Sequence, residues 1–366
     1  MSQYSFYQIW ILHAIKSYGV VPLNRLYRIL TRNRTMSTLI GVTEDKTEVF
    51  FASLPHLKEE YFHQLVDGFF REGIVSENES GIVLLREIPD FPLVTNGRHA
   101  VIYLMHPYSF VQLRDVTRLW VEWISYNRYE ETRYRPLIQN VWLQQLFKRW
   151  YKEKKENITS VWFSSVVDEF KVWSEKQEES VKGHWVGLFN GAKSTAALEN
   201  ELVSLWGFTT VEDCEPLSRL VLMKWVSDVF EEPENSPITY GWFSKMFEWI
   251  SHETSSVQET VRLFCKGMKR SEIAHLRKLK ESTINDHLLK YVLLTKEALY
   301  ERVEETKAAL AYKSLFENGQ YPRYKEAKDQ FESEGKKLDF FLFRYYQIKA
   351  LKERERHGSN IESIRI

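Results

Sequence analysis

The chain has 366 residues, which is enough for two or three domains with buried cores. Its 50 Lys and Arg balance 50 Asp and Glu, so no overall field steers it to nucleic acid or to a membrane surface, and any nucleic-acid site must be local. Two cysteines exclude a disulfide framework, and no apolar run approaches the ~18 residues of a membrane helix, so we expect a cytoplasmic protein without a membrane partner.

The residue pattern predicts a mainly α protein. Gly (15) and Pro (10) are sparse, and long stretches place apolar residues at three- and four-residue spacing. The 12 tryptophans are unevenly spread, since all but Trp10 lie between Trp120 and Trp249. We expect three domains: a winged-helix-like domain at 1–95, a Trp-rich helical domain at 96–255, and a helix-turn-helix domain with trailing helices at 256–366.

Residues 1–95 carry the element order of a winged helix. The stretch FYQIWILHAIKSY predicts a buried helix, Pro22 begins a second helix, and a third is expected around Leu57 to Phe70. The segment GIVSENESGIVLL then combines two short β-branched runs with a polar turn, which is a hairpin pattern. Three helices followed by a hairpin predict a winged-helix-like domain.

A basic patch lies on or after the second of these helices. No acid occurs between Val20 and Thr43, and the patch could be a solvated helix face or a nucleic-acid surface. The domain as a whole has nine basic and eleven acidic residues, which favours protein docking. The residues of this second basic patch are Arg25, Arg28, Arg32 and Arg34.

In the Trp-rich region, aromatic residues recur at helical spacing beside Leu, Val and Phe. Exposed tryptophans could stack on single-stranded bases, but this spacing favours core packing. GLFNGAKS at 187–194 nearly matches a phosphate-binding loop, with Lys193 and Ser194 in place. Ala192 replaces a required glycine and no buried strand precedes the stretch, so we expect no nucleotide site.

The stretch GMKRSEIAHLRKLKESTINDHLLKYV, residues 267–292, predicts a helix-turn-helix. A preceding helix ends at Gly267, a second covers RSEIAHLRKL, and a third covers ESTINDHLLKYV after the turn at 278–280. The spacing of Ala274, Leu279, Ile284 and Leu288 suits a tri-helical core.

The local charge of this motif favours DNA. Between Lys266 and Lys296 there are eight Lys or Arg and three Asp or Glu. Cations that reach phosphates add affinity that is independent of sequence and sensitive to salt, and short polar groups at a helix start can approach base edges. We expect phosphate contacts from Lys269, Arg270, Lys278 and Lys280, base proximity for Ser282, Thr283 and Asn285, and a further contact from Lys290.

Three features oppose reading of the base sequence. Lys280 stands where Ser or Thr commonly caps the recognition helix, and Lys278 stands where glycine is common in the turn. Glu281 and Asp286 place negative charge near the face that would meet phosphates. Backbone binding or protein binding is therefore favoured over sequence-specific reading.

The motif is similar to a helix-turn-helix found at the C-terminus of many RecQ-family helicases and, more distantly, to the LuxR-type DNA-binding domain. The matching residues are Leu263, Phe264, Gly267, Glu272, Ile273, Ala274, Leu279, Thr283, Ile284, His287 and Leu288. The whole chain resembles a bacterial YpbB-type helix-turn-helix protein through LNRLYRILTRNRT, FFREGIVSENESGIVLL, YPRYKEA and DFFLFRYYQIKAL. The resemblance implies an accessory protein that supplies this module in trans to a short RecQ-like helicase whose gene lies nearby.

We therefore expect a non-enzymatic DNA-binding accessory protein that partners a RecQ-like helicase in DNA repair or replication. The alternatives are a helix-turn-helix transcription regulator and an interaction scaffold that does not bind DNA. No catalytic set, cofactor site or metal site is expected, because the histidine pairs His56/His63 and His99/His106 have no ligand spacing. The oligomeric state is left open.

Overall fold

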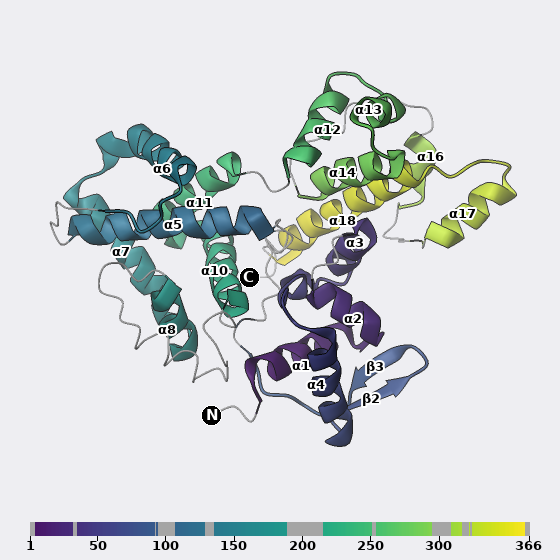
Figure 1. Cartoon of the computed structure of the whole chain (residues 1–366), viewed down its shortest axis with the longest axis horizontal. Helices are drawn as coiled ribbons and strands as arrows, with labels where there is room; N and C mark the ends of the chain where they lie inside the picture. Colours follow the sequence, from purple (N-terminus) through teal and green to yellow (C-terminus); the bar gives the residue numbers. More distant parts are fainter. Residues whose placement is uncertain are drawn as a thin grey trace. The chain divides into compact units, whose positions relative to one another are not determined.

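The structure is a computed structural model. It describes residues 4–31, 35–91, 93, 107–128, 135–188, 215–250, 254–294, 309–316, 322 and 324–362. The described part is mainly helical with a C-terminal helix-turn-helix, as predicted (Figure 1). The chain divides into two compact units, each formed by two segments. Unit 1 comprises Met1–Asn33 and Asp45–His252, and unit 2 comprises Arg34–Glu44 and Glu253–Ile366. The finer division into three domains stays a prediction.

The N-terminal part of unit 1 has the predicted winged-helix order. A three-stranded antiparallel sheet with strand order β1-β3-β2 accompanies three helices, and the two-residue β1 is too short to predict from its sequence. The elements are α1 (Phe6–Tyr18), β1 (Val20–Val21), α2 (Leu23–Leu30), α4 (Glu59–Arg71), β2 (Val75–Asn78) and β3 (Gly81–Leu84). Helix α1 begins with a capping box of Ser5 and Gln8 and ends at Gly19, whose φ is 67°.

The β2–β3 turn, which forms the wing, is set by Asn78 and Gly81. The Asn78 side-chain oxygen accepts hydrogen bonds from the backbone N–H groups of Ser80 (2.9 Å) and Gly81 (3.1 Å). Gly81 has a φ of 137°, and a Cβ there would lie 2.4 Å from the carbonyl carbon of Val21. Only glycine therefore fits where β3 passes β1.

The chain leaves the winged-helix order between α2 and α4. Helix α3 (Met36–Glu44) belongs to unit 2, where it contacts α14 and α18, and the one-turn η1 (Glu48–Phe50) follows in unit 1. Helix α3 was not among the predicted elements, because its sequence MSTLIGVTE contains β-branched residues and a glycine of low helix propensity. Tertiary burial of Met36, Leu39 and Ile40 stabilises it instead.

The Trp-rich part of unit 1 is a helical bundle with an aromatic core, as the spacing predicted. Trp120 stacks on Trp242 with ring centroids 4.7 Å apart, and Trp150 meets Trp242 edge-on at 5.0 Å. Trp142 differs, since 43% of it is exposed. The elements are α5 (Pro107–Arg128), α6 (Val141–Lys154), η3 (Lys155–Asn157), α7 (Ser160–Glu175), α8 (Glu179–Leu188), α10 (Glu215–Glu231), η5 (Pro233–Asn235) and α11 (Pro237–Trp249).

Buried charged groups join the parts of unit 1. Arg219 of α10 donates a hydrogen bond of 2.6 Å to the carbonyl of Ala52. Glu169 of α7 accepts from the backbone N–H groups of Ile238 and Thr239, both at 2.9 Å, and so caps the start of α11. Each contact satisfies a charge that would otherwise be costly to bury.

The local structure does not suit the near-match to a phosphate-binding loop. Gly187 and Leu188 are the last residues of helix α8, whereas a phosphate-binding loop follows a strand. The remainder of that motif, including Lys193 and Ser194, lies outside the described residues.

Unit 2 is built around α14. Helix α14 packs against α12, α13 and α18, and α3 packs on it as well (Figure 1). The elements are α12 (Ser255–Cys265), α13 (Arg270–Arg277), α14 (Glu281–Leu294), α16 (Ala309–Ser314), α17 (Tyr324–Ser333) and α18 (Phe340–Glu362). Across the part of the chain that the structure describes, no helix is long and apolar enough to cross a membrane.

Candidate nucleic-acid interface

The turn between α12 and α13 closes as a Schellman motif. The Met268 N–H bonds to the Leu263 carbonyl at 3.4 Å, and the Gly267 N–H bonds to the Phe264 carbonyl at 3.1 Å. Gly267 has a φ of 104°, which a residue with a Cβ rarely adopts. The predicted helix end at this glycine is confirmed.

The turn between α13 and α14 closes in the same way but with a lysine at its centre. Lys278 is left-handed, with φ 53° and ψ 40°, while Leu279 N–H bonds to the Ala274 carbonyl at 3.0 Å and Lys278 N–H bonds to the His275 carbonyl at 3.2 Å. A lysine in this conformation costs on the order of 1 kcal/mol relative to glycine. The backbone thus places an exposed cation at the tip of the turn.

The tri-helical core forms, but two of the four predicted core residues are less buried than expected. Ile284 and Leu288 are fully buried, as expected, whereas Ala274 and Leu279 are only half-buried. Ile273, next to Ala274, is fully buried and fills the central position on α13. Burial of this larger aliphatic side chain contributes more free energy than burial of alanine does.

A polar network ties α13 and α14 to α12. Arg277 donates to the backbone carbonyl of Ser256 at 2.7 Å, to its hydroxyl at 2.8 Å, and to the hydroxyl of Thr260. Thr260 also shares a hydrogen bond of 2.9 Å with Nδ1 of His287. Burial, followed by the charges of Lys290 and Arg277, lowers the pKa of His287 to about 4, so this imidazole is neutral near pH 7. Arg277 and His287 therefore hold the motif together.

Arg270, one of the predicted phosphate ligands, is held inside unit 2. Its guanidinium forms an ion pair of 2.7 Å with Asp339 at the start of α18 and stacks 4.6 Å from the ring centre of Phe341. It also donates to the side-chain oxygen of Asn285 at 3.0 Å. Burial raises the pKa of the Asp339 carboxyl. The hydrogen bond from Arg270 and the backbone hydrogen bonds from Leu342 and Phe341 together outweigh burial, so the pKa is lowered. Arg270 and Asn285 thus contact each other and α18.

Three of the predicted cations remain exposed at the two turns that flank α13. Lys269 lies at the first turn and Lys278 and Lys280 at the second, and they are hereafter the turn lysines. Among the described residues, none of the three is in an ion pair. The nearby Glu272 carboxylate accepts a hydrogen bond of 2.7 Å from the backbone N–H of Lys269 and does not pair with its side chain. A lysine side chain only donates, so Lys280 cannot cap α14 with its side chain.

The polar residues that open α14 differ in their accessibility. Ser282 is exposed and Thr283 is half-buried. Lys290 and Asp286 are both half-buried, and burial raises the pKa of Asp286 more than the nearby charge of Lys290 lowers it. Leu276, which is 58% exposed on α13, was not among the predicted site residues. Its apolar side chain on a surface helix carries no sequence pattern that would distinguish it from a core leucine.

The second basic patch is only partly described. Arg25 pairs with Asp45 at 2.7 Å and lies over the ring of Tyr18, while Arg28 is exposed on α2. Arg32 and Arg34 lie outside the described residues. Since the Asp45 carboxylate already neutralises Arg25, this patch offers less free charge than its sequence indicates.

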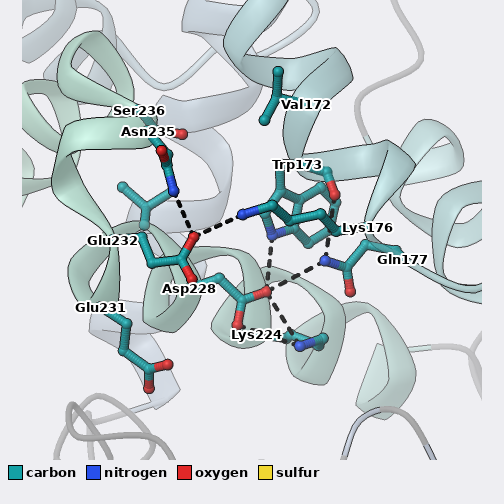
Figure 2. A pocket seen from close by; sticks show the side chains of 11 residues that line it. Val172, Trp173, Lys176, Gln177, Lys224, Asp228, Glu231, Glu232, Asn235 and Ser236 are labelled. Carbon is teal, nitrogen blue, oxygen red and sulfur yellow. Dashed lines mark hydrogen bonds and ion pairs between the residues drawn. The ribbon is translucent and has the colours of Figure 1, made fainter. Parts of the chain in front are cut away.

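A pocket of about 260 Å³ lies between α7, α10 and η5 in unit 1 (Figure 2). Its polar groups are mutually paired: Asp228 accepts from Trp173 at 2.9 Å, and Glu232 pairs with Lys176 at 2.7 Å. Asn235 also donates to Glu232 at 2.6 Å. Lys224 pairs with Asp228 at 3.1 Å, so the carboxylates of Asp228 and Glu232 are each matched by a lysine of the lining. Within the described residues, no group of three or more His, Cys, Asp or Glu is placed to hold a metal ion.

Comparison with known proteins supports the C-terminal motif. Residues 256–347 match the model of a family described as a helix-turn-helix domain, which covers about a quarter of the chain. No curated protein and no solved structure matches the chain significantly. The matched segment contains α12, α13 and α14 and reaches into α18, and a domain of this kind is a non-catalytic module that suggests DNA binding.

Proposed function

We propose that this chain is a non-enzymatic DNA-binding accessory protein whose helix-turn-helix grips the DNA backbone with low sequence specificity. The observation that carries the proposal is the state of the turn lysines: Lys269, Lys278 and Lys280 are exposed and unpaired among the described residues, while Arg270 and Arg277 are occupied within unit 2. Free cations at the two ends of α13 can reach phosphates of the DNA backbone.

Contact with bases is limited in this proposal. Ser282 and Thr283 open α14 and lie nearest the bases. Lys290, about two turns further along α14, supplies a further phosphate contact. Asn285 is bonded to Arg270 at 3.0 Å, and the exposed Glu281 repels phosphates beside it. Backbone contacts therefore supply most of the affinity.

The partner we propose is a RecQ-like helicase, to which this chain supplies the helix-turn-helix in trans during DNA repair or replication. This part of the proposal is supported by the resemblance of residues 263–288 to the module at the end of such helicases. It is independent of the DNA contacts, because the module can serve as a docking surface as well.

The DNA role is tested with the full chain and labelled duplexes of two unrelated sequences, measured by fluorescence anisotropy across a range of salt concentrations. Replacing the three turn lysines by Gln should weaken binding to both duplexes alike and reduce the slope of log affinity against log salt by about 2.7, or about 0.9 for each lost phosphate contact. The control replaces Lys325, Lys328 and Lys336, which are exposed in the same unit, and should leave the slope unchanged.

Two outcomes decide between the candidate roles. Unchanged affinity and slope in the turn-lysine variant would contradict DNA binding by the helix-turn-helix turns and favour the interaction scaffold. Tight binding to one sequence with a large ratio of affinities over the other favours a transcription regulator.

The partner is tested by a pull-down from the native cell, which should retain a RecQ-like helicase after nuclease treatment. Absence of the helicase would contradict the partnership while leaving DNA binding in place.

A further inference from the structure

A row of lysines runs along the solvent-facing side of α6 and into η3 in unit 1. Lys148, Lys152 and Lys155, hereafter the α6 lysine row, are all exposed and follow one another at four- and three-residue spacing. These intervals place side chains on one face of a helix. The opposite side of α6 carries Leu143 and Trp150, which are buried.

The row lacks counterions in the described part of the chain. Of the two carboxylates next to the row, Glu153 is engaged elsewhere, since it lies 3.5 Å from Arg149 and 4.0 Å from Lys245. The other, Glu156, is exposed in η3 and forms no ion pair with the row among the described residues. Arg149 itself stacks 4.3 Å from the ring centre of Trp249. The cation on the flank of α6 is therefore paired and packed, whereas the three lysines of the row face solvent unpaired.

Helix stability does not account for this arrangement. Like charges at three- and four-residue spacing destabilise a helix by roughly 0.2–0.5 kcal/mol per pair. The helix dipole favours cations in the last turn, where Lys152 lies, but its effect fades before Lys148. A bound polyanion would turn the mutual repulsion of the row into attraction.

The dimensions and the neighbouring side chain indicate which polyanion fits. The helical rise separates Lys148 from Lys152 by about 6 Å and from Lys155 by about 10 Å along the axis, so the ammonium groups follow an extended chain of charges. Tyr151, on the edge of the row, is 41% exposed and is held edge-on against Trp123 at 5.6 Å. Cations beside a fixed, exposed aromatic ring are typical of surfaces that bind single-stranded nucleic acid.

We propose that the α6 lysine row binds the phosphate backbone of single-stranded nucleic acid and that Tyr151 stacks on one of its bases. This surface lies in unit 1 and uses none of the helix-turn-helix residues, so it goes beyond the proposed function and can fail or succeed independently of it.

The test uses the full chain with the turn lysines already replaced by Gln, so that binding at the helix-turn-helix does not contribute. A labelled oligothymidine is titrated by fluorescence anisotropy at several salt concentrations. Replacing Lys148, Lys152 and Lys155 by Gln should reduce the slope of log affinity against log salt by about 2, or about 0.7 per phosphate on a single strand. Tyr151→Ala should weaken binding roughly tenfold, and Tyr151→Phe should retain it.

The matched control replaces Lys171, Lys176 and Lys182 by Gln. These lysines lie in the same unit and form ion pairs of 3.8, 2.7 and 2.6 Å, so the charge change is equal but the free charge lost is small. Slope and affinity should stay unchanged in this control. Unaltered oligothymidine binding in the row variant overturns the proposal, as does equally tight, row-dependent binding of polyglutamate, which would assign the surface to an acidic protein. Equal losses on duplex DNA together with no effect of Tyr151→Ala overturn the single-strand assignment.

Discussion

Arg270 and Lys278 belong to one short basic stretch, yet their side chains have different surroundings. Arg270 is enclosed by Asp339, Asn285 and Phe341, while Lys278 is exposed at the tip of a turn. A guanidinium suits the enclosed position because its planar fork binds a carboxylate and stacks on a ring simultaneously. Two cations that look equivalent in the sequence thus divide into a structural group and a candidate ligand.

His184 is the residue whose burial has the clearest consequence for pH. It lies on α8 with Nε2 3.0 Å from the hydroxyl of Ser218 on α10, and burial lowers its pKa to about 4. As the pH falls, this imidazole takes up a proton near pH 6.5 in the unfolded chain but only near pH 4 in the folded chain. The stability that the neutral imidazole contributes is therefore fully present above pH 6.5 and is lost as the pH falls towards 4. At pH 5 the loss amounts to about 2 kcal/mol.

We predict that His184→Gln removes this part of the pH dependence. The free energy of unfolding is measured in urea at pH 7 and at pH 5. Its decrease between the two pH values should be about 2 kcal/mol smaller in the variant than in the unaltered chain. His275→Gln, at an exposed position on α13, is the control and should match the unaltered chain. A difference at His275 equal to that at His184 would assign the effect to general charge.

At the scale of elements, the two turns of the helix-turn-helix use the same closure with different residues. Gly267 and Lys278 both have positive φ, and each turn carries the paired backbone hydrogen bonds of a Schellman motif. Only glycine adopts this region without steric cost. The lysine at the second turn is therefore strained, and the proposed phosphate contact gives a reason for its presence.

Lys278→Gly should separate stability from binding. We expect the free energy of unfolding to rise by up to about 1 kcal/mol as the strain is relieved, and the DNA affinity to fall with the loss of one phosphate contact. Lys266→Gly is the matched control, because Lys266 is an exposed helix-end lysine with a φ of −73°. There the glycine should lower stability by about 0.5–1 kcal/mol through backbone entropy. Destabilisation by Lys278→Gly would contradict the account of the turn.

At the scale of the whole chain, the two units are interleaved in sequence. Residues 34–44, which include α3, belong to unit 2, although unit 1 continues on both sides of them. The segment that matches the helix-turn-helix family, 256–347, therefore lacks one helix of the unit in which it folds. Gln347 of α18 donates to Glu44 of α3, and Leu39 is fully buried there.

We predict that Leu39→Ala destabilises unit 2, although Leu39 is far in sequence from the other helices of that unit. Loss of a buried leucine should lower the free energy of unfolding by about 3 kcal/mol and increase hydrogen exchange in α14 and α18. Ser37→Ala, at an exposed position on the same helix, should change neither quantity. Faster exchange confined to α1 and α4 would contradict the assignment of α3 to unit 2.

Much of this architecture follows from local patterns. Apolar spacing placed α1, α2, α4 and the three helices of the helix-turn-helix, and Asn78 with the glycines indicated the turns, because these signals depend on residues within one or two helical turns. The aromatic spacing likewise predicted that the tryptophans form a core. Helix α3 escaped prediction because its propensity is low and its stability comes from packing against distant residues.

The candidate site needed contacts that no local pattern contains. Arg270 and Asp339 are 69 residues apart, so nothing near Arg270 in the sequence indicates that its charge is neutralised. The same holds for the α6 lysine row, since a run of lysines is a binding surface only where acids from other elements do not reach it. Residue types and periodicity select the helices and their buried faces through short-range sterics and the hydrophobic effect. Which charges stay free depends on side chains brought together by folding, and therefore on the three-dimensional arrangement of each unit.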